Sequence, residues 1–254
     1  MLHRLNSKVA NRITNLLAGQ CGAQNWTTRE AWLESTLDSL PAGYRILDAG
    51  AGELKYKRFC THLDYVSQDF AQYDGSGDGA GLQMGEWDQS QLDIVSDIVD
   101  IPVDDASFDA VMCIEVLEHL PSPVRALREL TRVLKPGGTL VLTAPFCALT
   151  HYAPYFYQTG YSRYFYEYWL TEMGYEIKDM QWNGNYFDYL GQELRRLPSV
   201  GKRYAGMLPT WFERFAIAVV LRLLNRLSQH NENSEELLAF GLLVRACKVS
   251  NGHH

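Results

Sequence analysis

Two scarcities restrict what this chain can be. Among its 254 residues there is no stretch of roughly 18 uncharged apolar residues, so no transmembrane helix is predicted. Arg4, Lys8 and Arg12 interrupt the apolar residues near the N-terminus, a pattern that differs from a signal peptide. The five cysteines include no CxxC pair and are odd in number, which is typical of reduced thiols in a cytoplasmic protein. The sequence therefore predicts neither disulfides nor a metal site.

Positive charge is also in short supply. Lys and Arg number 23 against 30 Asp and Glu, and the formal net charge of −7 argues against binding of nucleic acid through bulk electrostatics. Hydrophobic residues make up 46% of the chain and charged residues 21%, a composition typical of globular proteins. A chain of this length can bury one substantial core, or a core with a lid.

Periodicity of the apolar residues predicts an alternation of strands and helices. The expected strands are 44–49, 65–68, 94–96, 110–114, 139–144, 175–182 and 238–248. The expected helices are 2–18, 28–40, 54–63, 123–134, 164–173, 186–197 and 209–229. This order predicts an α/β fold: a doubly wound, mostly parallel, seven-stranded Rossmann-like sheet with helices on both faces and a helical lid.

Four divisions of the chain follow from this order of elements. They are an N-terminal helical cap (1–43), a Rossmann-like core (44–185), a helical insertion or lid (186–234), and the last strand with a tail (235–254). Within the core, residues 73–86 are rich enough in glycine to be expected as a mobile loop.

Acidic residues follow four successive predicted strands. Asp48 ends the first strand and leads into Gly50 and Gly52, which allow backbone to approach a ligand closely. The next three strands end in acids at Asp69, Asp97 and Glu115. Carboxyl ends of parallel strands meet at one edge of a sheet, where four like charges are unfavourable unless a ligand uses them. A cationic small molecule rich in hydrogen-bond donors would suit this edge.

Several motifs in register give the family resemblance. They are Ile101-Pro102, Ser107-Phe108-Asp109, Glu115-Val116-Leu117-Glu118-His119, and Leu127-Arg128-Glu129-Leu130 followed by Thr131-Arg132-Val133-Leu134-Lys135-Pro136-Gly137-Gly138. With these motifs, residues from about 44 to 146 resemble a class I S-adenosylmethionine-dependent methyltransferase, in particular the small-molecule group with an EVLEH motif after the fourth strand. The resemblance implies S-adenosylmethionine as the cofactor and methyl transfer as the reaction.

The resemblance also assigns roles to individual residues. Asp48, Gly50 and Gly52 match the motif whose backbone faces the methionine part of the cofactor. Asp69 matches the acid that accepts both ribose hydroxyls, since two carboxylate oxygens suit two adjacent donors. Asp97 matches the acid that accepts a hydrogen bond from the adenine amino group, and the Ile98 N–H matches the group near a ring nitrogen of adenine. Cys113 and Glu115 match residues that border the methionine portion.

Two alternatives remain open. A nicotinamide-dependent oxidoreductase could use a similar sheet, but Lys55 occupies the place of the third glycine of its phosphate-binding motif. A non-catalytic member could keep the fold as a binding module, although the retained acids Asp48, Asp69 and Asp97 argue against it.

The segment after the fifth predicted strand is rich in tyrosine, from residue 152 to residue 166. In the resembled fold this segment lies beside the transferred methyl group. Tyrosines supply flat apolar faces with hydroxyl groups, which favours a small or medium acceptor such as a sugar, an aromatic ring or a lipid-linked glycan intermediate. For O- or N-methylation, the candidates for a general base are His151, then His119, then Tyr155. Simple packing of the aromatic residues onto the sheet is the alternative.

The predicted helix at 209–229 is amphipathic. Its apolar side is expected to carry Phe212, Ala216, Val219, Val220, Leu223 and Leu227. We expect this side to cover the core of the protein, with peripheral membrane contact or a homodimer as alternatives, because Arg214, Arg222 and Arg226 lie opposite.

Overall fold

The computed structural model describes residues 19–249, so the helix expected at 2–18 lies outside the described residues. The described chain forms two compact units. One combines residues 29–181 with 241–249, and the other combines residues 19–28 with 182–240. The first unit therefore takes in most of the helix that the sequence assigned to an N-terminal cap.

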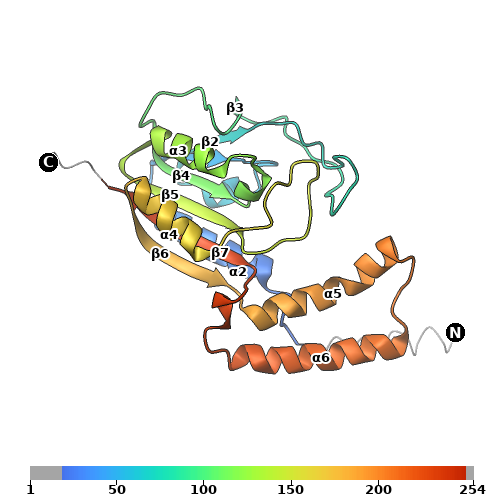
Figure 1. Ribbon diagram of the computed structural model, residues 1–254. Helices are drawn as coiled ribbons and strands as arrows, with labels where there is room; N and C mark the ends of the chain where they lie inside the picture. Colours follow the sequence, from blue (N-terminus) through green and yellow to red (C-terminus); the bar gives the residue numbers. More distant parts are fainter. Residues whose placement is uncertain (1–18, 250–254) are drawn as a thin grey trace. The chain divides into compact units, whose positions relative to one another are not determined.

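The sheet has seven strands in the order β3-β2-β1-β4-β5-β7-β6 (Figure 1). The strands are β1 (Arg45–Ala49), β2 (Asp64–Asp69), β3 (Ile94–Val95), β4 (Phe108–Ile114), β5 (Leu134–Pro145), β6 (Tyr175–Asn183) and β7 (Gly241–Lys248). Strands β3, β2, β1, β4 and β5 pair in parallel, whereas β7 runs antiparallel to β5. The seven-stranded, mostly parallel Rossmann-like fold predicted from the sequence is confirmed.

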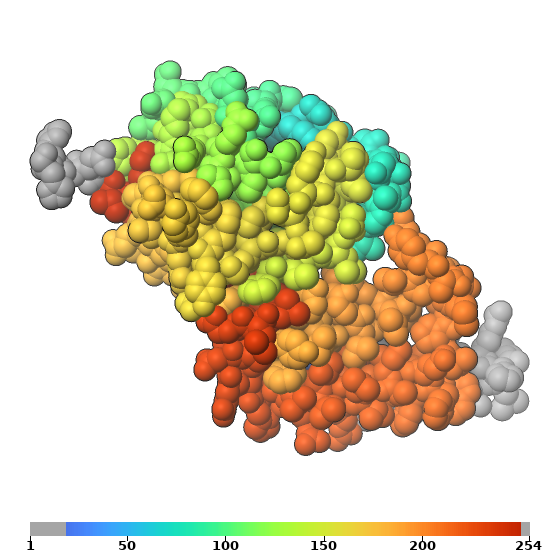
Figure 2. All heavy atoms as spheres, viewed as in Figure 1, coloured from blue at the N-terminus to red at the C-terminus, as the bar shows by residue number. Residues whose placement is uncertain are grey.

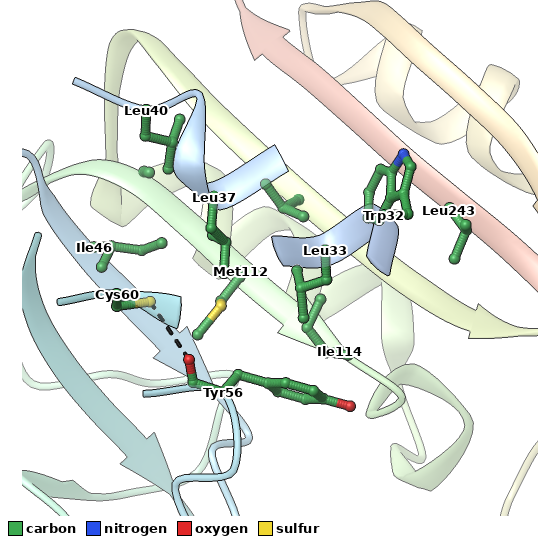
Figure 3. Close-up of a cluster of buried hydrophobic side chains, with 12 residues drawn as sticks. Trp32, Leu33, Leu37, Leu40, Ile46, Tyr56, Cys60, Met112, Ile114 and Leu243 are labelled. Atoms are coloured by element: carbon green, nitrogen blue, oxygen red, sulfur yellow. Dashed lines mark hydrogen bonds between the residues drawn. The ribbon is translucent and has the colours of Figure 1, made fainter. Parts of the chain in front are cut away.

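Helix α2 (Asn25–Asp38) covers one face of this sheet. Its side chains Leu33 and Leu37 are fully buried against Ile46 and Met112, as Figure 3 shows. Full burial of one leucine side chain stabilises a fold by roughly 1.5–3 kcal/mol. The indole Nε1 of Trp32 donates a hydrogen bond of 3.0 Å to Asp179 on β6, so the helix is also joined to the sheet by a polar contact.

The opposite face is covered by helices α3 (Pro123–Val133) and α4 (Arg163–Glu172) (Figure 1). Helix α3 buries Ala126, Leu127, Leu130 and Val133, which recur at the spacing of one helical face. Both faces of the sheet are therefore covered, which explains why strands such as β4 read as nearly continuous apolar runs.

Two predicted helices differ in the structure. The helix expected at 54–63 is reduced to a single 3-10 turn, Lys57–Phe59, because Leu54 has a φ of +59°, outside the helical region. Helix α5 (Tyr186–Tyr204) continues beyond the expected end at residue 197 and contains Pro198. Proline removes one backbone donor from a helix, yet here the helix runs past it.

Helices α5 and α6 (Trp211–Gln229) form the main part of the second unit. They pack against each other, and hydrogen bonds of Ser228 to Asn185 and Asp188 join the end of α6 to the start of α5. The prediction of which side of α6 is buried is wrong. The buried residues are Ala218, Leu221 and Leu224, whereas the side expected to cover the core is exposed. The exposed residues of that side are Phe212, Ala216, Val219, Val220, Leu223 and Leu227. Contact with a membrane or a second copy stays a prediction.

Among the residues that the structure describes, no helix combines the length and the apolar character needed to cross a bilayer.

Candidate cofactor and acceptor site

The turn after β1 brings its backbone close to neighbouring side chains. The N–H groups of Gly50 and Ala51 both donate to the carbonyl of Gln68, at 2.8 and 2.9 Å. Gly50 has a φ of +81°, and a Cβ atom on it would lie 2.4 Å from Cγ2 of Val116. Only glycine fits this position without strain, because both the backbone conformation and the available space exclude a side chain.

Asp69, the last residue of β2, is held by three donors. One carboxylate oxygen accepts the Gly52 N–H at 2.9 Å, and the other accepts the Ala71 N–H at 3.1 Å and the Gln89 side-chain amide at 3.0 Å. Asp69 is only 7% exposed. The turn after β1 and the end of β2 are therefore tied together through this carboxylate.

A cavity of about 460 Å³ lies at the carboxyl ends of β1, β2 and β3. Such a volume falls within the range of roughly 300–1,000 Å³ typical of small-molecule sites. Four of the predicted cofactor residues line it: Gly50, Asp69, Asp97 and Ile98. The sequence missed several other lining residues, among them Phe70 and Gln72, because aromatic and amide side chains after a strand carry no specific signal.

The other predicted cofactor residues do not line this cavity. Asp48 is 1% exposed and accepts a hydrogen bond of 2.6 Å from the Tyr65 hydroxyl. Burial raises the pKa of Asp48 to about 7, although the Tyr65 hydrogen bond opposes this shift. Cys113 is fully buried within β4, and Gly52 contributes its N–H to Asp69. Of these residues, Gly52 is linked to the cavity through its hydrogen bond to Asp69.

Glu115 follows β4 in a strained conformation, with a φ of +57°. Its carboxylate accepts the Thr143 hydroxyl at 2.9 Å and forms an ion pair of 2.8 Å with Arg29. Arg29, whose contribution the sequence did not reveal, is largely buried. Burial lowers the pKa of its guanidinium, but Glu115, Tyr56 and Glu118 together outweigh burial and raise it.

Glu118 and the two predicted histidines come together beside the cavity. The carboxylate oxygen Oε1 of Glu118 lies 3.7 Å from Nε2 of His119 and 3.8 Å from Nε2 of His151. Glu118 is completely buried, and burial together with the nearby Glu115 raises its pKa well above the usual range. Neither of its carboxylate oxygens accepts a hydrogen bond from the described residues.

Backbone carbonyls determine which nitrogen of each histidine carries the proton. Nδ1 of His119 lies 2.6 Å from the carbonyl of Tyr155, and Nδ1 of His151 lies 2.9 Å from the carbonyl of Leu149. A carbonyl only accepts, so each Nδ1 is a donor, and a ring in the neutral state then has its lone pair on Nε2. Burial, with a further contribution from His151, lowers the pKa of His119 to about 4, so this ring is neutral at pH 7.

Tyr155 lies at the boundary between the two parts of the site. It lines the cavity, its carbonyl orients His119, and its ring packs edge-on against Phe70 at 4.9 Å. The three residues predicted as general bases, His151, His119 and Tyr155, are therefore close neighbours in the structure. Of the two histidines, only His119 lines the cavity itself.

The glycine-rich segment 73–86 supports this region. Its Leu82 N–H donates to the carbonyl of Thr150 at 2.9 Å, and its carbonyl accepts the Tyr152 N–H at 3.0 Å. Figure 2 shows the two segments side by side on the surface, in cyan and yellow-green. Tyr152 stacks on His119, with ring centroids 5.0 Å apart. The segment expected to be a mobile loop is thus paired with the segment that carries His151.

Comparison with known proteins identifies the family of the central part of this chain. Residues 47–142 match the family model described as a methyltransferase domain. A tRNA (carboxymethyluridine(34)-5-O)-methyltransferase of Arabidopsis thaliana is 36% identical over 110 residues, which are 42% of this chain and 25% of that protein. The 27-O-demethylrifamycin SV methyltransferase of Amycolatopsis mediterranei is 34% identical over 108 residues, which are 41% of this chain and 39% of that protein.

Residues 47–142 form a methyltransferase domain of the class I, S-adenosylmethionine-dependent kind. The match spans less than half of the length of these two relatives. Among solved structures, the [4+2]-cyclase SpnF has a TM-score of 0.52 at 19% identity, with 86% of this chain and 80% of that chain covered. At this identity the likeness shows the fold alone.

The residues of the methyltransferase domain fit its cofactor. Asp69 and Asp97 line the cavity, and carboxylate oxygens are acceptors for the hydroxyl and amino groups of a nucleoside. At Gly50 the backbone borders the same cavity without a side chain in the way. A cavity with carboxylates, free of any described Lys or Arg on its lining, suits a positively charged ligand better than a pyrophosphate.

Proposed function

We propose that this protein transfers a methyl group from S-adenosylmethionine to an oxygen of a small or medium acceptor. The observation that carries the proposal is one cavity that is lined both by the acidic residues Asp69 and Asp97 and by His119 and Tyr155. The two relatives described above are named as O-methyltransferases, which favours oxygen over nitrogen as the acceptor atom.

In this proposal the residues that line the cavity bind either the cofactor or the acceptor. Asp69 accepts hydrogen bonds from the ribose, Asp97 and Ile98 hold the adenine, and Gly50 gives the methionine portion close access to the backbone. The cofactor supplies a methyl group activated by a positively charged sulfur, so the protein contributes mainly proximity and alignment. His119 and Tyr155 are proposed to face the acceptor.

The acceptor class follows from the aromatic residues at the cavity. Tyr155 and the 48% exposed Tyr157 both line it, and Phe70 lies beside Tyr155. Flat side chains of this kind favour an acceptor with an aromatic ring or the apolar face of a sugar, which includes a lipid-linked glycan intermediate.

Calorimetric titration with S-adenosylhomocysteine and with NAD tests the proposal. We expect the first to bind and the second not to bind. Asp97→Ala should weaken S-adenosylhomocysteine binding about tenfold, the usual effect of one lost polar contact. The matched control is Asp100→Ala, an exposed aspartate three positions away that does not line the cavity.

Unchanged affinity in Asp97→Ala would remove Asp97 from the cofactor site. Binding of NAD without S-adenosylhomocysteine would favour the oxidoreductase alternative. A screen of acceptors with cofactor labelled in the methyl group then separates an enzyme from a binding module, because only an enzyme transfers label.

A further inference from the structure

The buried carboxylate of Glu118 has no partner that accounts for its position. Its side chain is 0% exposed, and neither oxygen accepts a hydrogen bond from the described residues. The buried cation Arg29 is paired with Glu115 at 2.8 Å. An ionised carboxylate buried in this way is strongly unfavourable unless a positive charge lies against it.

His119 also has a buried polar atom without a hydrogen-bond partner among the described residues. Its Nδ1–H is used by the carbonyl of Tyr155, and its buried Nε2 has no hydrogen-bond partner among the described residues. The Nε2 atom lies 3.7 Å from Glu118 Oε1, too far for a hydrogen bond. Glu118 Oε1 and His119 Nε2 therefore lie close together without a hydrogen bond between them.

His151 completes the convergence from another segment of the chain. Its Nε2 lies 3.8 Å from the same Oε1 atom, and its Nδ1 faces the carbonyl of Leu149. One ligand atom from each of Glu118, His119 and His151 lies within 4.8 Å of the other two. With metal–ligand bonds of about 2.1 Å, two ligands at a tetrahedral angle lie roughly 3.4 Å apart, so small side-chain rotations would close the group on a cation.

We propose that Glu118, His119 and His151 form a binding site for a divalent cation of the Zn²⁺ class. Two imidazoles with one carboxylate suit borderline cations such as Zn²⁺ or Co²⁺ better than Mg²⁺, which prefers oxygen ligands. A carbonyl on the far nitrogen of each imidazole is the usual arrangement around metal-bound histidines, since it fixes both the tautomer and the ring. The sequence predicted no metal here, because that prediction considered only the cysteines.

A role for the cation rests on the proposed function. Three protein ligands leave a coordination position for another oxygen, and His119 belongs to both the cluster and the cavity wall. An acceptor hydroxyl bound there loses its proton to solvent water more readily, because the cation lowers its pKa. Its oxygen then forms the bond to the methyl carbon while the carbon–sulfur bond breaks and its electron pair stays on sulfur. His119 and His151 act in this scheme as ligands and not as general bases.

Metal binding to the full-length protein is measured after treatment with a chelator. Titration with Zn²⁺ against a chromophoric chelator should give one site per chain, and Mg²⁺ should bind at least 100-fold more weakly. Co²⁺ should produce the visible absorption of a low-symmetry site. His151→Ala and Glu118→Gln should each weaken Zn²⁺ binding at least 100-fold.

Two control variants test whether Zn²⁺ binds to histidines outside the cluster. His230→Ala removes an exposed histidine outside the cluster, and the double variant His253→Ala/His254→Ala removes the adjacent pair at the end of the sequence. Both should keep the site. Because Glu118 is buried, circular dichroism and S-adenosylhomocysteine binding are recorded for every variant, and His151→Ala serves as the test on a partly exposed residue.

The metal site and the proposed function can fail separately. Absence of a Zn²⁺ site in the wild-type protein, or an unchanged site in His151→Ala, would overturn the metal proposal while leaving S-adenosylhomocysteine binding intact. Zn²⁺ binding that depends on His151, in a protein that fails to bind S-adenosylhomocysteine, would support the metal site and overturn the proposed function.

Discussion

Gly50 and Gly43 allow the effect of crowding at the cofactor turn to be separated from backbone strain. Both glycines have a φ of +81°. A Cβ atom on Gly43 would meet nothing within 4 Å, whereas one on Gly50 would lie 2.4 Å from Cγ2 of Val116. An alanine in the left-handed region costs roughly 1–2 kcal/mol, and forcing extra atoms into a packed site costs roughly 1–3 kcal/mol.

The free energy of unfolding should therefore fall by roughly 1–2 kcal/mol in Gly43→Ala and by roughly 2–5 kcal/mol in Gly50→Ala. Urea denaturation followed by tryptophan fluorescence measures both, provided that the slope with urea is unchanged. Gly50 and Val116 also line the cavity, so Gly50→Ala should weaken S-adenosylhomocysteine binding, whereas Gly43→Ala should not.

A third variant identifies the crowding atom. In Gly50→Ala/Val116→Ala both Cγ atoms are removed and the nearest remaining atom of residue 116 is Cβ, at 3.2 Å, so the double-mutant cycle should show a favourable coupling of roughly 1–3 kcal/mol. Equal losses of stability in the two single glycine variants, together with an additive cycle, would refute the reasoning. The backbone conformation alone would then account for the glycine.

Two further predictions concern stability. Because the pKa of Asp48 is raised from 3.8 to about 7, the folded state keeps a proton that the unfolded state loses, so this residue lowers the free energy of unfolding as pH rises from about 4 to 7. In wild type, this effect lowers the free energy of unfolding by about 1 kcal/mol per pH unit between about pH 4 and 7, and Asp48→Asn should abolish it. Urea denaturation at several pH values measures the free energy of unfolding of both proteins. Parallel plots of this free energy against pH for the two proteins would contradict the prediction. Trp32→Phe should lower the free energy of unfolding by about 1–2 kcal/mol through loss of the bond to Asp179, and it should show almost no effect in an Asp179→Ala background. Equal effects in both backgrounds would assign the loss to packing.

The cofactor side of the site could be predicted from the sequence because its signals are local. Each strand end is followed at once by its functional residue, as with Asp69 after β2, and glycine marks the turn after β1. The register of parallel strands then brings these ends together without further information. Local rules failed where one residue adopts an unusual conformation: nothing in the sequence indicates that Leu54 has a φ of +59°, which shortens the expected helix.

Helix α6 shows a second limit of local reasoning. Its apolar residues lie on more than one side, so periodicity alone chose the wider group that includes Phe212 and Val219. The structure buries the narrower row at Ala218, Leu221 and Leu224, which recur at helical spacing, and α6 packs against α5. The sequence could show that α6 is amphipathic but not which neighbour it packs against.

The acceptor side of the site depends on contacts between distant segments, and these contacts involve backbone. His151 is flanked by two hydrogen bonds that Leu82 makes to Thr150 and Tyr152, and every non-proline residue can form such bonds. The sequence therefore identified His119 and His151 one at a time, each as a possible base. Convergence of their Nε2 atoms on Glu118 requires carbonyls at both Nδ1 atoms and a glycine-rich segment that pairs beside His151. The fold thus brings one ligand atom from each of Glu118, His119 and His151 within 4.8 Å of the other two, which no local pattern in the sequence indicates.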